Sequence, residues 1–372
     1  MKIGVVRGAF LNPWEGQNFE PLLKNHQLIA FGAKKILAPP GKIPVIHLWS
    51  PTDLPDFPKK MPILNRLMID AHYLLGLEKQ LQGFDIAHCA ETYYHYTQQC
   101  LRARKRGWVK KVVATCWEII PFNNEGIWGR KSFKQQAFRE VDLFITPTKK
   151  AKHALIQEGC SPEKIIVVRM GVNLDKFKHQ TTNQNPKSLK ILFVGRLAEE
   201  KGVWDLLEVF RQLLIDLKNF SINLVLIGAG REKKKVLKWI NHVSIYQYIN
   251  TRVVEYWEMP KEYQEADIFV FPSKPITTME EQYGMALVEA MAAGLPIVTT
   301  RCGAIPEVVG QAALLVNPGD QKQLYSALRE LIESEERRRV LGLKARQRAE
   351  KEFDRDKTAS QLEEIYIQLL NG

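Results

Sequence analysis

The stretch of sequence that decides the fold is Phe271-Pro-Ser-Lys-Pro-Ile-Thr-Thr-Met-Glu-Glu-Gln-Tyr-Gly-Met-Ala-Leu-Val-Glu-Ala-Met-Ala-Ala-Gly-Leu-Pro296. It predicts the end of an apolar strand, a long loop and then a helix that begins at Gly284. The first amides of such a helix have no intrahelical acceptor, and these are the amides of Gly284, Met285, Ala286 and Leu287. Together with the helix dipole they form a predicted anion site.

Two glutamates accompany this predicted anion site. Glu281 stands just before it, where a carboxylate can meet sugar hydroxyls. Glu289 lies about 7.5 Å further along the helix axis, too far to assist a phosphate. Its neighbours are mostly apolar, so its carboxylate requires a hydrogen-bonding partner, and we predict that it accepts from the two hydroxyls of a ribose. A surface glutamate is the alternative.

A second motif, Lys190-Ile-Leu-Phe-Val-Gly-Arg-Leu-Ala-Glu-Glu-Lys-Gly202, reads as strand, turn and helix start. Gly195 ends the strand at a point where a side chain would obstruct a ligand. Arg196 and Lys201 flank the turn, and two such cations can bind a diphosphate, the arginine as a planar fork and the lysine as a point charge. The alternative is an ordinary turn with surface cations.

Short apolar runs alternate with amphipathic stretches along the rest of the chain, which favours parallel sheets with crossover helices. We predict strands at residues 3–6, 44–48, 85–88, 111–115, 143–146, 165–168, 190–194, 223–227, 252–255, 268–271, 297–299 and 314–316, and C-terminal helices at 335–352 and 357–370. The polar segment 179–188 lacks apolar periodicity and predicts a domain boundary. The expected fold class is α/β, with Rossmann-like domains at 1–178 and 189–355 facing each other across a cleft, and helix 356–372 packing back on the first.

The net charge of +12 is spread unevenly over the 372 residues. Residues 1–175 hold 25 Lys and Arg against 15 Asp and Glu, a net of +10, which leaves 28 against 26 for residues 176–372. The densest basic run comprises Arg102, Arg104, Lys105, Arg106, Lys110 and Lys111. Such a run suits an anionic partner, and a solvated lysine-rich surface explains it equally well.

The remaining composition points to a cytoplasmic protein without a metal site. The five cysteines form no C-x-x-C pair and are expected to be reduced thiols, and a predicted strand directly follows Met1-Lys2 where a signal peptide would stand. No histidine has metal-ligand spacing, and Asp354-Arg-Asp356 is interpreted as a helix break with its cap. Since fixed cations already neutralise a diphosphate, we expect no metal cofactor.

The pair Glu281-x7-Glu289, in its surrounding motif, resembles the signature of glycosyltransferase family 4, which has the GT-B fold. The turn around Gly195 to Gly202 resembles the donor-phosphate motif of that family. Other similar segments are 142–148, 165–177, 266–273 and 303–309. The resemblance implies a retaining hexosyltransferase that takes a hexose from a UDP- or GDP-sugar and passes it to a glycan, lipid-linked or small-molecule hydroxyl.

The resemblance also implies residue roles. Glu281 would contact the donor sugar, Arg196 and Lys201 the diphosphate, and Glu289 the ribose. The base would lie near Tyr256-Trp257, with Trp257 the expected contact, and Gly16 would lie close to the donor phosphate. The loop that contains Gly16 lacks the paired glycines common in the family.

The first domain is expected to bind the acceptor, and one segment there departs from the family pattern. Many members place a histidine near the sugar, where this chain has Cys116-Trp117. Tryptophan cannot act as an acid or a base, so Glu118 is one candidate, and a loop carboxylate is the alternative. Front-face attack, with the departing phosphate taking the proton of the acceptor, would need no protein base.

Two interpretations of the acceptor side stay open. The excess basic charge, with Tyr93, Tyr94, Tyr96 and Trp108 interleaved, suits peripheral contact with the cytoplasmic face of an anionic membrane, and the same aromatic residues suit a sugar-stacking cleft. The competing functions are a nucleotide-sugar epimerase of the same fold and a basic nucleic-acid-binding protein. No RNA- or DNA-binding module is recognisable, so no nucleic-acid partner is expected.

Overall fold

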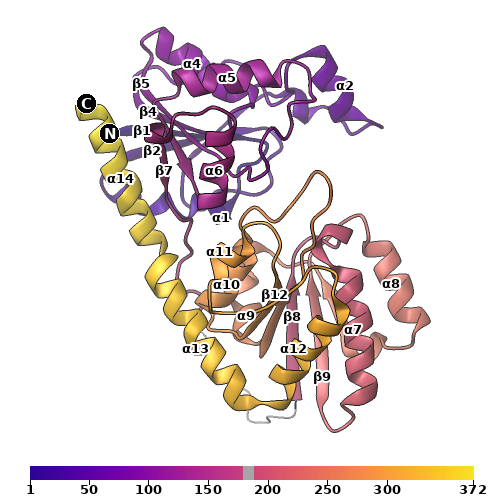
Figure 1. Ribbon diagram of the computed structural model, residues 1–372. Coiled ribbons are helices and arrows are strands. Elements are labelled where there is room, and N and C mark those ends of the chain that lie inside the picture. Colours follow the sequence, from indigo (N-terminus) through magenta and orange to yellow (C-terminus); the bar gives the residue numbers. More distant parts are fainter. Residues whose placement is uncertain (179–187) are drawn as a thin grey trace. The chain divides into compact units, whose positions relative to one another are not determined.

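The computed structural model describes residues 1–178 and 188–372. The chain divides into two compact units, one formed by Met1–Gly171 with Arg355–Gly372 and the other by Val172–Asp354 (Figure 1). Residues 172–178, which we assigned to the first domain, therefore belong to the second unit. The reason is local: Val172 pairs with Asp354 in an isolated parallel bridge, and its N–H donates to the Phe353 carbonyl at 2.9 Å. Most of the polar segment that predicted the boundary, 179–187, lies outside the described residues.

Unit 1 contains a parallel seven-stranded sheet with the order β3-β2-β1-β4-β5-β6-β7. Its strands are β1 (Lys2–Gly8), β2 (Gln27–Ala33), β3 (Val45–Leu48), β4 (Phe84–Ala90), β5 (Val109–Thr115), β6 (Leu143–Thr146) and β7 (Ile165–Val167). The sequence analysis missed β2. Its apolar run is short and contains Gly32, a residue that weakens a strand prediction.

Helices cover this sheet on both faces, as a parallel sheet requires. They are α1 (Pro13–Gly16), α2 (Lys60–Leu67), α3 (Leu77–Gln80), α4 (His95–Lys105), α5 (Arg130–Glu140), α6 (Lys149–Gln157) and α14 (Arg355–Asn371). In Figure 1, α4 and α5 lie side by side, and the two helices also contact each other in the structure.

The C-terminal helix α14 completes unit 1. The Tyr366 hydroxyl lies 2.5 Å from Nδ1 of His88 on β4, and both side chains are buried. Arg355 at the start of α14 forms an ion pair with Glu20 at 2.7 Å. Burial lowers the pKa of His88 well below its usual value, so this imidazole is neutral and holds the helix by hydrogen bonding.

Unit 2 contains a parallel six-stranded sheet with the order β10-β9-β8-β11-β12-β13. Its strands are β8 (Ser188–Val194), β9 (Ser221–Ile227), β10 (Ile249–Arg252), β11 (Ile268–Phe271), β12 (Ile297–Thr300) and β13 (Leu314–Val316). Its helices are α7 (Val203–Asp216), α8 (Lys233–His242), α9 (Met259–Gln264), α10 (Met285–Ala292), α11 (Ile305–Val309), α12 (Gln321–Glu333) and α13 (Glu335–Glu352). The prediction for 252–255 was three residues late, because β10 ends at Arg252.

Helix α7 shows why this sequence folds as it does. Leu206, Phe210 and Leu213 recur at helical spacing and are fully buried in the core of unit 2. Burial of each such side chain contributes about 2 kcal/mol. Helix α12 packs against α7 on the same layer. Among the helices of residues 1–178 and 188–372, none combines the length and the apolar character needed to cross a bilayer.

Candidate functional site

The two sequence motifs lie at the topological switch point of the second sheet. The chain enters that sheet at β8, and the strand order reverses between β8 and β11. The loop after β8 contains Arg196 and Lys201, and the loop after β11 contains Glu281. In open parallel sheets, ligands bind at the carboxyl ends of the strands at this point.

Three predicted and unpredicted side chains meet there. Lys201 Nζ lies 2.5 Å from Glu281 Oε2, and both side chains are largely buried. The Ser273 hydroxyl donates to the same carboxylate oxygen at 3.1 Å. The ammonium group of Lys201 also lies 5.2 Å from the centre of the Phe271 ring. The structure therefore joins two residues that the sequence analysis assigned to different parts of a donor, and it adds Ser273, which that analysis missed.

Two glycines allow this close approach. Gly202 has φ +68°, and a Cβ there would lie 1.9 Å from the Pro272 carbonyl oxygen, so the turn after β8 packs directly on the loop after β11. Gly303 has φ +58°, and its Cβ would lie 2.1 Å from the Glu281 carbonyl oxygen. The next amide, that of Ala304, donates to the same oxygen at 2.8 Å. The segment after β12 therefore holds the backbone of Glu281.

Arg196 lies beside this group but points to a different carboxylate. Its guanidinium is 56% exposed and lies 3.0 Å from Glu200 Oε1. Arg231 contacts the other oxygen of Glu200 at 2.7 Å. A Cβ at Gly228 would lie 2.0 Å from the Gly195 carbonyl oxygen, and this close packing brings the Arg231 loop against the turn after β8. Arg231 was missed because its loop follows a different strand, β9.

The start of α10 has fewer available amides than predicted. Gly284 precedes the helix with φ +83°, and its carbonyl accepts from the Leu287 N–H at 2.8 Å. The prediction that the Leu287 amide has no intrahelical acceptor is therefore wrong, because the first turn is tightened around Gly284. Within the described ranges, no acceptor faces the N–H groups of Gly284, Met285 and Ala286.

Glu289 lies inside α10 and not on the surface, with 4% of its area exposed. The Tyr263 hydroxyl donates to its Oε2 at 2.7 Å. Burial raises the pKa of the Glu289 carboxyl to about 7, and hydrogen bonds from Tyr263 and Tyr256 partly offset that rise. Trp257, next to Tyr256, is 70% exposed. Its indole is therefore available for stacking, whereas Tyr256 reaches the carboxylate.

The two remaining glycines of the prediction have different surroundings. Gly16 closes α1, and a Cβ there would lie 2.5 Å from the Pro40 carbonyl oxygen, which explains the glycine by packing inside unit 1. Gly195 follows β8, and a Cβ there would meet neighbouring rings at 3.5 Å, an ordinary contact. Neither observation tests the predicted closeness of these residues to a phosphate.

The segment that departs from the family pattern turns out to involve a carboxyl group we had not considered. Glu118 Oε1 accepts from the amides of Ile119 and Ile120, and its Oε2 accepts from side-chain amides, so it caps its own turn. This engagement counts against the acid or base role considered for Glu118. The amide of Trp117 instead donates to Oε1 of Glu91 at 2.8 Å. Burial raises the pKa of Glu91 to about 8.

The dense basic run of unit 1 is mostly neutralised. Four of its cations form ion pairs, namely Arg102 with Glu78, Arg104 with Asp142, Lys105 with Glu140 and Lys110 with Asp85. Tyr93 and Tyr96 are buried in the core, so they cannot line a membrane surface or an open cleft. The run is therefore a poor anionic docking surface, contrary to the interpretation that its charge density favoured.

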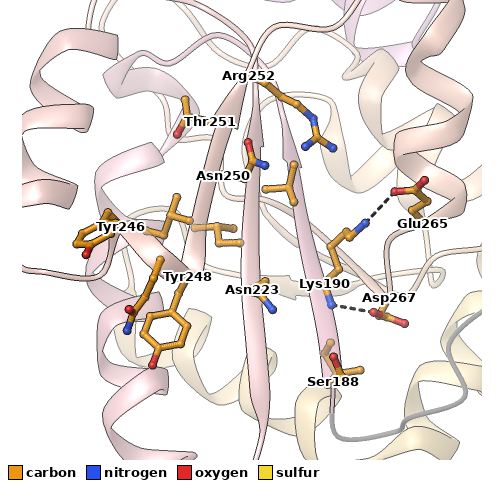
Figure 2. A pocket seen from close by; sticks show the side chains of 15 residues that line it. Ser188, Lys190, Asn223, Tyr246, Tyr248, Asn250, Thr251, Arg252, Glu265 and Asp267 are labelled. Atoms are coloured by element: carbon orange, nitrogen blue, oxygen red, sulfur yellow. Dashed lines mark hydrogen bonds and ion pairs between the residues drawn. The ribbon is translucent and has the colours of Figure 1, made fainter.

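A cavity of about 930 Å³ lies away from these motifs, over the β8, β9 and β10 strands of unit 2 (Figure 2). Lys190 and Asp267 at its edge lie at the amino ends of their strands, and Lys190 is paired with Glu265 at 2.9 Å. None of the predicted site residues lines this cavity. Its charged side chains are paired, and this part of unit 2 is distinct from the switch-point site.

Two parallel α/β units, with the phosphate-binding motifs at a switch point, define a protein of the GT-B class. Comparisons with known proteins agree. The family model described as "Glycosyltransferase Family 4" matches residues 27–176, and that described as "Glycosyl transferases group 1" matches residues 175–348. The chain belongs to glycosyltransferase family 4.

Relatives and solved structures extend this finding. A putative colanic acid biosynthesis glycosyltransferase of Salmonella typhimurium is 31% identical over 239 residues, which cover 62% of this chain and 57% of the relative. The amylovoran biosynthesis glycosyltransferase AmsK of Erwinia amylovora is 31% identical over 62% of this chain and 58% of its own length. The matches thus span less than two thirds of either relative.

The solved structures show the fold. HepE of Anabaena, in complex with UDP and glucose, superimposes with a TM-score of 0.78 at 18% identity, over 98% of this chain and 99% of HepE. A sucrose-phosphate synthase from Thermosynechococcus elongatus superimposes with a TM-score of 0.76 at 17% identity, over 99% of each chain.

Proposed function

We propose that this protein is a retaining hexosyltransferase that uses a nucleoside-diphosphate hexose as donor. The observation that carries the proposal is the contact between Lys201 and Glu281, beside the unpaired amides that begin α10. It places a cation for the diphosphate and a carboxylate for sugar hydroxyls at one switch point. Glu289 lies further along the same helix, at the place expected for a ribose.

The relatives support this proposal and suggest the pathway class. Several carry names of polysaccharide biosynthesis glycosyltransferases, among them the capsular polysaccharide protein CapM of Staphylococcus aureus, 27% identical over 65% of this chain and 67% of that protein. HepE has been solved with UDP-glucose as well as with UDP and glucose. We therefore favour a UDP-hexose as donor and a glycan or a lipid-linked glycan as acceptor.

The residues of unit 2 account for the leaving group. As the anomeric bond breaks, negative charge grows on the nucleoside diphosphate, and fixed charges or dipoles aimed at it are usually the largest catalytic contribution. Lys201, Arg196 and the amides of Gly284, Met285 and Ala286 would supply them. The departing phosphate would take the proton of the acceptor on the same face, so that the configuration is retained and no protein base is needed.

The same cations make a metal unnecessary in this proposal. Arg196 and Lys201, with Arg231 close by, carry enough positive charge to balance a diphosphate. We therefore expect turnover to be insensitive to EDTA, and loss of activity that Mg²⁺ or Mn²⁺ restores would contradict this part of the proposal.

Contact with a membrane is proposed through α2 and not through the dense basic run. Leu67 is 79% exposed and Ile63 is also exposed, and among the residues of this short helix Leu64 is the buried one. Lys59 and Arg66 are exposed beside them. Apolar and basic side chains on one short helix suit the boundary of an anionic bilayer, where a lipid-linked acceptor would lie.

Product analysis is the direct test of the reaction. The purified protein is incubated with UDP-glucose, UDP-galactose and GDP-mannose in turn, with p-nitrophenyl glycosides as acceptors. We expect release of one nucleoside diphosphate and a new glycoside with the anomeric configuration of the donor, which proton NMR reads directly. A donor converted to its epimer without release of a nucleotide would establish the epimerase alternative, and an inverted product would contradict retention.

A further inference from the structure

Unit 1 has a switch point of its own. Its strand order reverses between β1 and β4, so the loops that follow these two strands share one crevice at the carboxyl edge of the sheet. The loop after β1 begins at Ala9, and the loop after β4 begins at Glu91. Neither loop contributes a residue to the motifs of the donor site, so the content of this crevice must be considered separately.

Aromatic rings form one wall of this crevice. The Phe10 ring stacks on His72 with centroids 4.9 Å apart and on Tyr94 with centroids 5.4 Å apart. Phe10 is 37% exposed, whereas His72 is buried beneath it. An exposed ring supported by other rings offers a rigid apolar face, on which the C–H face of a sugar ring can lie.

A buried carboxylate holds this aromatic wall in place. Asp70 contacts Nδ1 of His72 at 2.9 Å and the guanidinium of Arg130 at 2.7 Å, and it accepts from the His95 amide at 3.0 Å. It has φ +69°, a conformation rare for a residue with a side chain. Strained residues of this kind cluster at functional sites, where the surrounding structure maintains them.

Glu91 is a second strained carboxyl group, on the other side of the crevice. It has φ +58°, its amide donates to the Thr115 carbonyl at 2.8 Å, and its Oε1 accepts from the Trp117 amide. The described part of the chain provides no partner for its Oε2. The backbone thus fixes a carboxyl group at the end of β4 with one oxygen left to interact with a ligand.

The protonation state of Glu91 follows from the groups around it. Burial raises the pKa of this carboxyl to about 8, and the Trp117 amide partly offsets that rise. Glu118 and Glu158 face it as further negative charges, Lys134 as a positive charge, and the phenols of Tyr93 and Tyr94 are also near. At neutral pH the group is therefore a carboxylic acid, which can donate a hydrogen bond as well as accept one.

We propose that this crevice binds an uncharged sugar ring of the acceptor against Phe10, with Glu91 in its acid form donating a hydrogen bond to a hydroxyl of that ring. The inference rests on the proposed function and adds the acceptor side to it. An anionic group would fit poorly, because Arg130 is already paired with Asp70 and Arg7 with Glu15. Glu91 is thus the positioning group that Trp117, at the place of the family histidine, cannot be.

Binding of simple glycosides tests the proposal without requiring turnover. Methyl glycosides of glucose, galactose and mannose are titrated against the full chain by saturation-transfer NMR. The variants are Phe10→Ala, Glu91→Ala and Glu91→Gln, with Glu140→Gln as control for loss of a carboxyl group remote from the crevice, and thermal unfolding establishes that each is folded. At pH 6.5 we expect Phe10→Ala and Glu91→Ala to raise the Kd about tenfold and Glu140→Gln to leave it unchanged.

The glutamine variant separates an acid from a carboxylate. A glutamine amide donates a hydrogen bond at every pH, so Glu91→Gln should bind within twofold of the unmodified chain at pH 6.5. At pH 9.5 the unmodified chain should bind several-fold more weakly, and Glu91→Gln should not. The proposal is overturned if no glycoside binds, if Glu91→Ala binds normally, or if Glu91→Gln loses binding as Glu91→Ala does. Nucleotide binding by unit 2 is measured separately, so failure here is distinguishable from failure of the donor assignment.

Discussion

Lys201 Nζ lies 2.5 Å from Glu281 Oε2, and this ion pair joins the loops that follow β8 and β11. Without a donor, the carboxylate balances the charge of the lysine. A bound diphosphate would compete for the same ammonium group, which would release Glu281 toward the sugar hydroxyls. We infer that the pair organises the empty site and separates its two functions when the donor arrives.

The first prediction concerns the coupling of these two residues. Lys201→Met should lower kcat about a hundredfold, because a lost charged contact to the leaving group costs on the order of 3 kcal/mol. Glu281→Gln should also lower kcat, and the double variant should lose less than the sum of the two, because the residues contact each other. Steady-state kinetics of a double-mutant cycle measures this. Lys190→Met, which removes a different ion pair of unit 2, should leave kcat unchanged, and strict additivity would refute the coupling.

The second prediction concerns Gly303, which packs on the backbone of Glu281. Gly303→Ala should lower kcat at least tenfold while nucleotide binding at Glu289 persists, because its Cβ would displace Glu281. Gly319→Ala is the matched control: Gly319 also has positive φ, at +77°, but nothing lies within 4 Å of a Cβ there. Both variants should lose about 1–2 kcal/mol of stability from backbone strain, and only the first should lose turnover. Equal kcat in the two variants would show that Gly303 does not position Glu281.

Local patterns of sequence were sufficient for most strands and for the donor motifs. The apolar runs around Ile268 and Leu314 predicted their strands because the residues are buried on both faces, which leaves continuous β-branched and aliphatic segments. Glu289 was recognised as buried because its helix is apolar on all sides. These features depend on residues that are neighbours in the sequence.

Features that depend on distant residues could not be predicted. The partners of the basic run, such as Glu78 for Arg102 and Asp142 for Arg104, are far along the chain, so the run looked unpaired. Glu118 was considered because it follows Trp117, whereas Glu91 is brought to the same place by pairing of β4 with β5. Nothing local to Glu91 announces its positive φ or its burial.

The third prediction is a pH dependence of stability. The pKa of Glu91 is raised to about 8 by burial and that of Glu289 to about 7, so the native state must keep both protonated where the unfolded chain ionises them. Their contribution is fully present below the usual carboxyl pKa and is lost as the pH rises through 7 and 8. Glu91→Gln should therefore gain stability relative to the unmodified chain between pH 5 and pH 8, by at least about 1 kcal/mol. Urea unfolding at both pH values measures the difference, and an unchanged difference would contradict the raised pKa.

The fourth prediction concerns α2 and the membrane. The double variant Ile63→Ser, Leu67→Ser should bind several-fold less to vesicles of phosphatidylglycerol and phosphatidylcholine, because it removes the exposed apolar side chains of that helix. Leu343→Ser is the control, since Leu343 is equally an exposed leucine but lies on α13 of unit 2. Co-sedimentation at low and high salt measures binding. Vesicle binding that survives the double variant would remove α2 from the account.

The most direct test of the donor assignment is calorimetry of UDP, GDP and ADP with the unmodified protein and with Glu289→Ala. The account predicts micromolar binding of one nucleotide, UDP in our proposal, weakened at least tenfold in the variant because the ribose hydroxyls lose their acceptor. If no nucleotide binds, or if Glu289→Ala binds equally well, then the ribose assignment is wrong and the proposed donor site is contradicted.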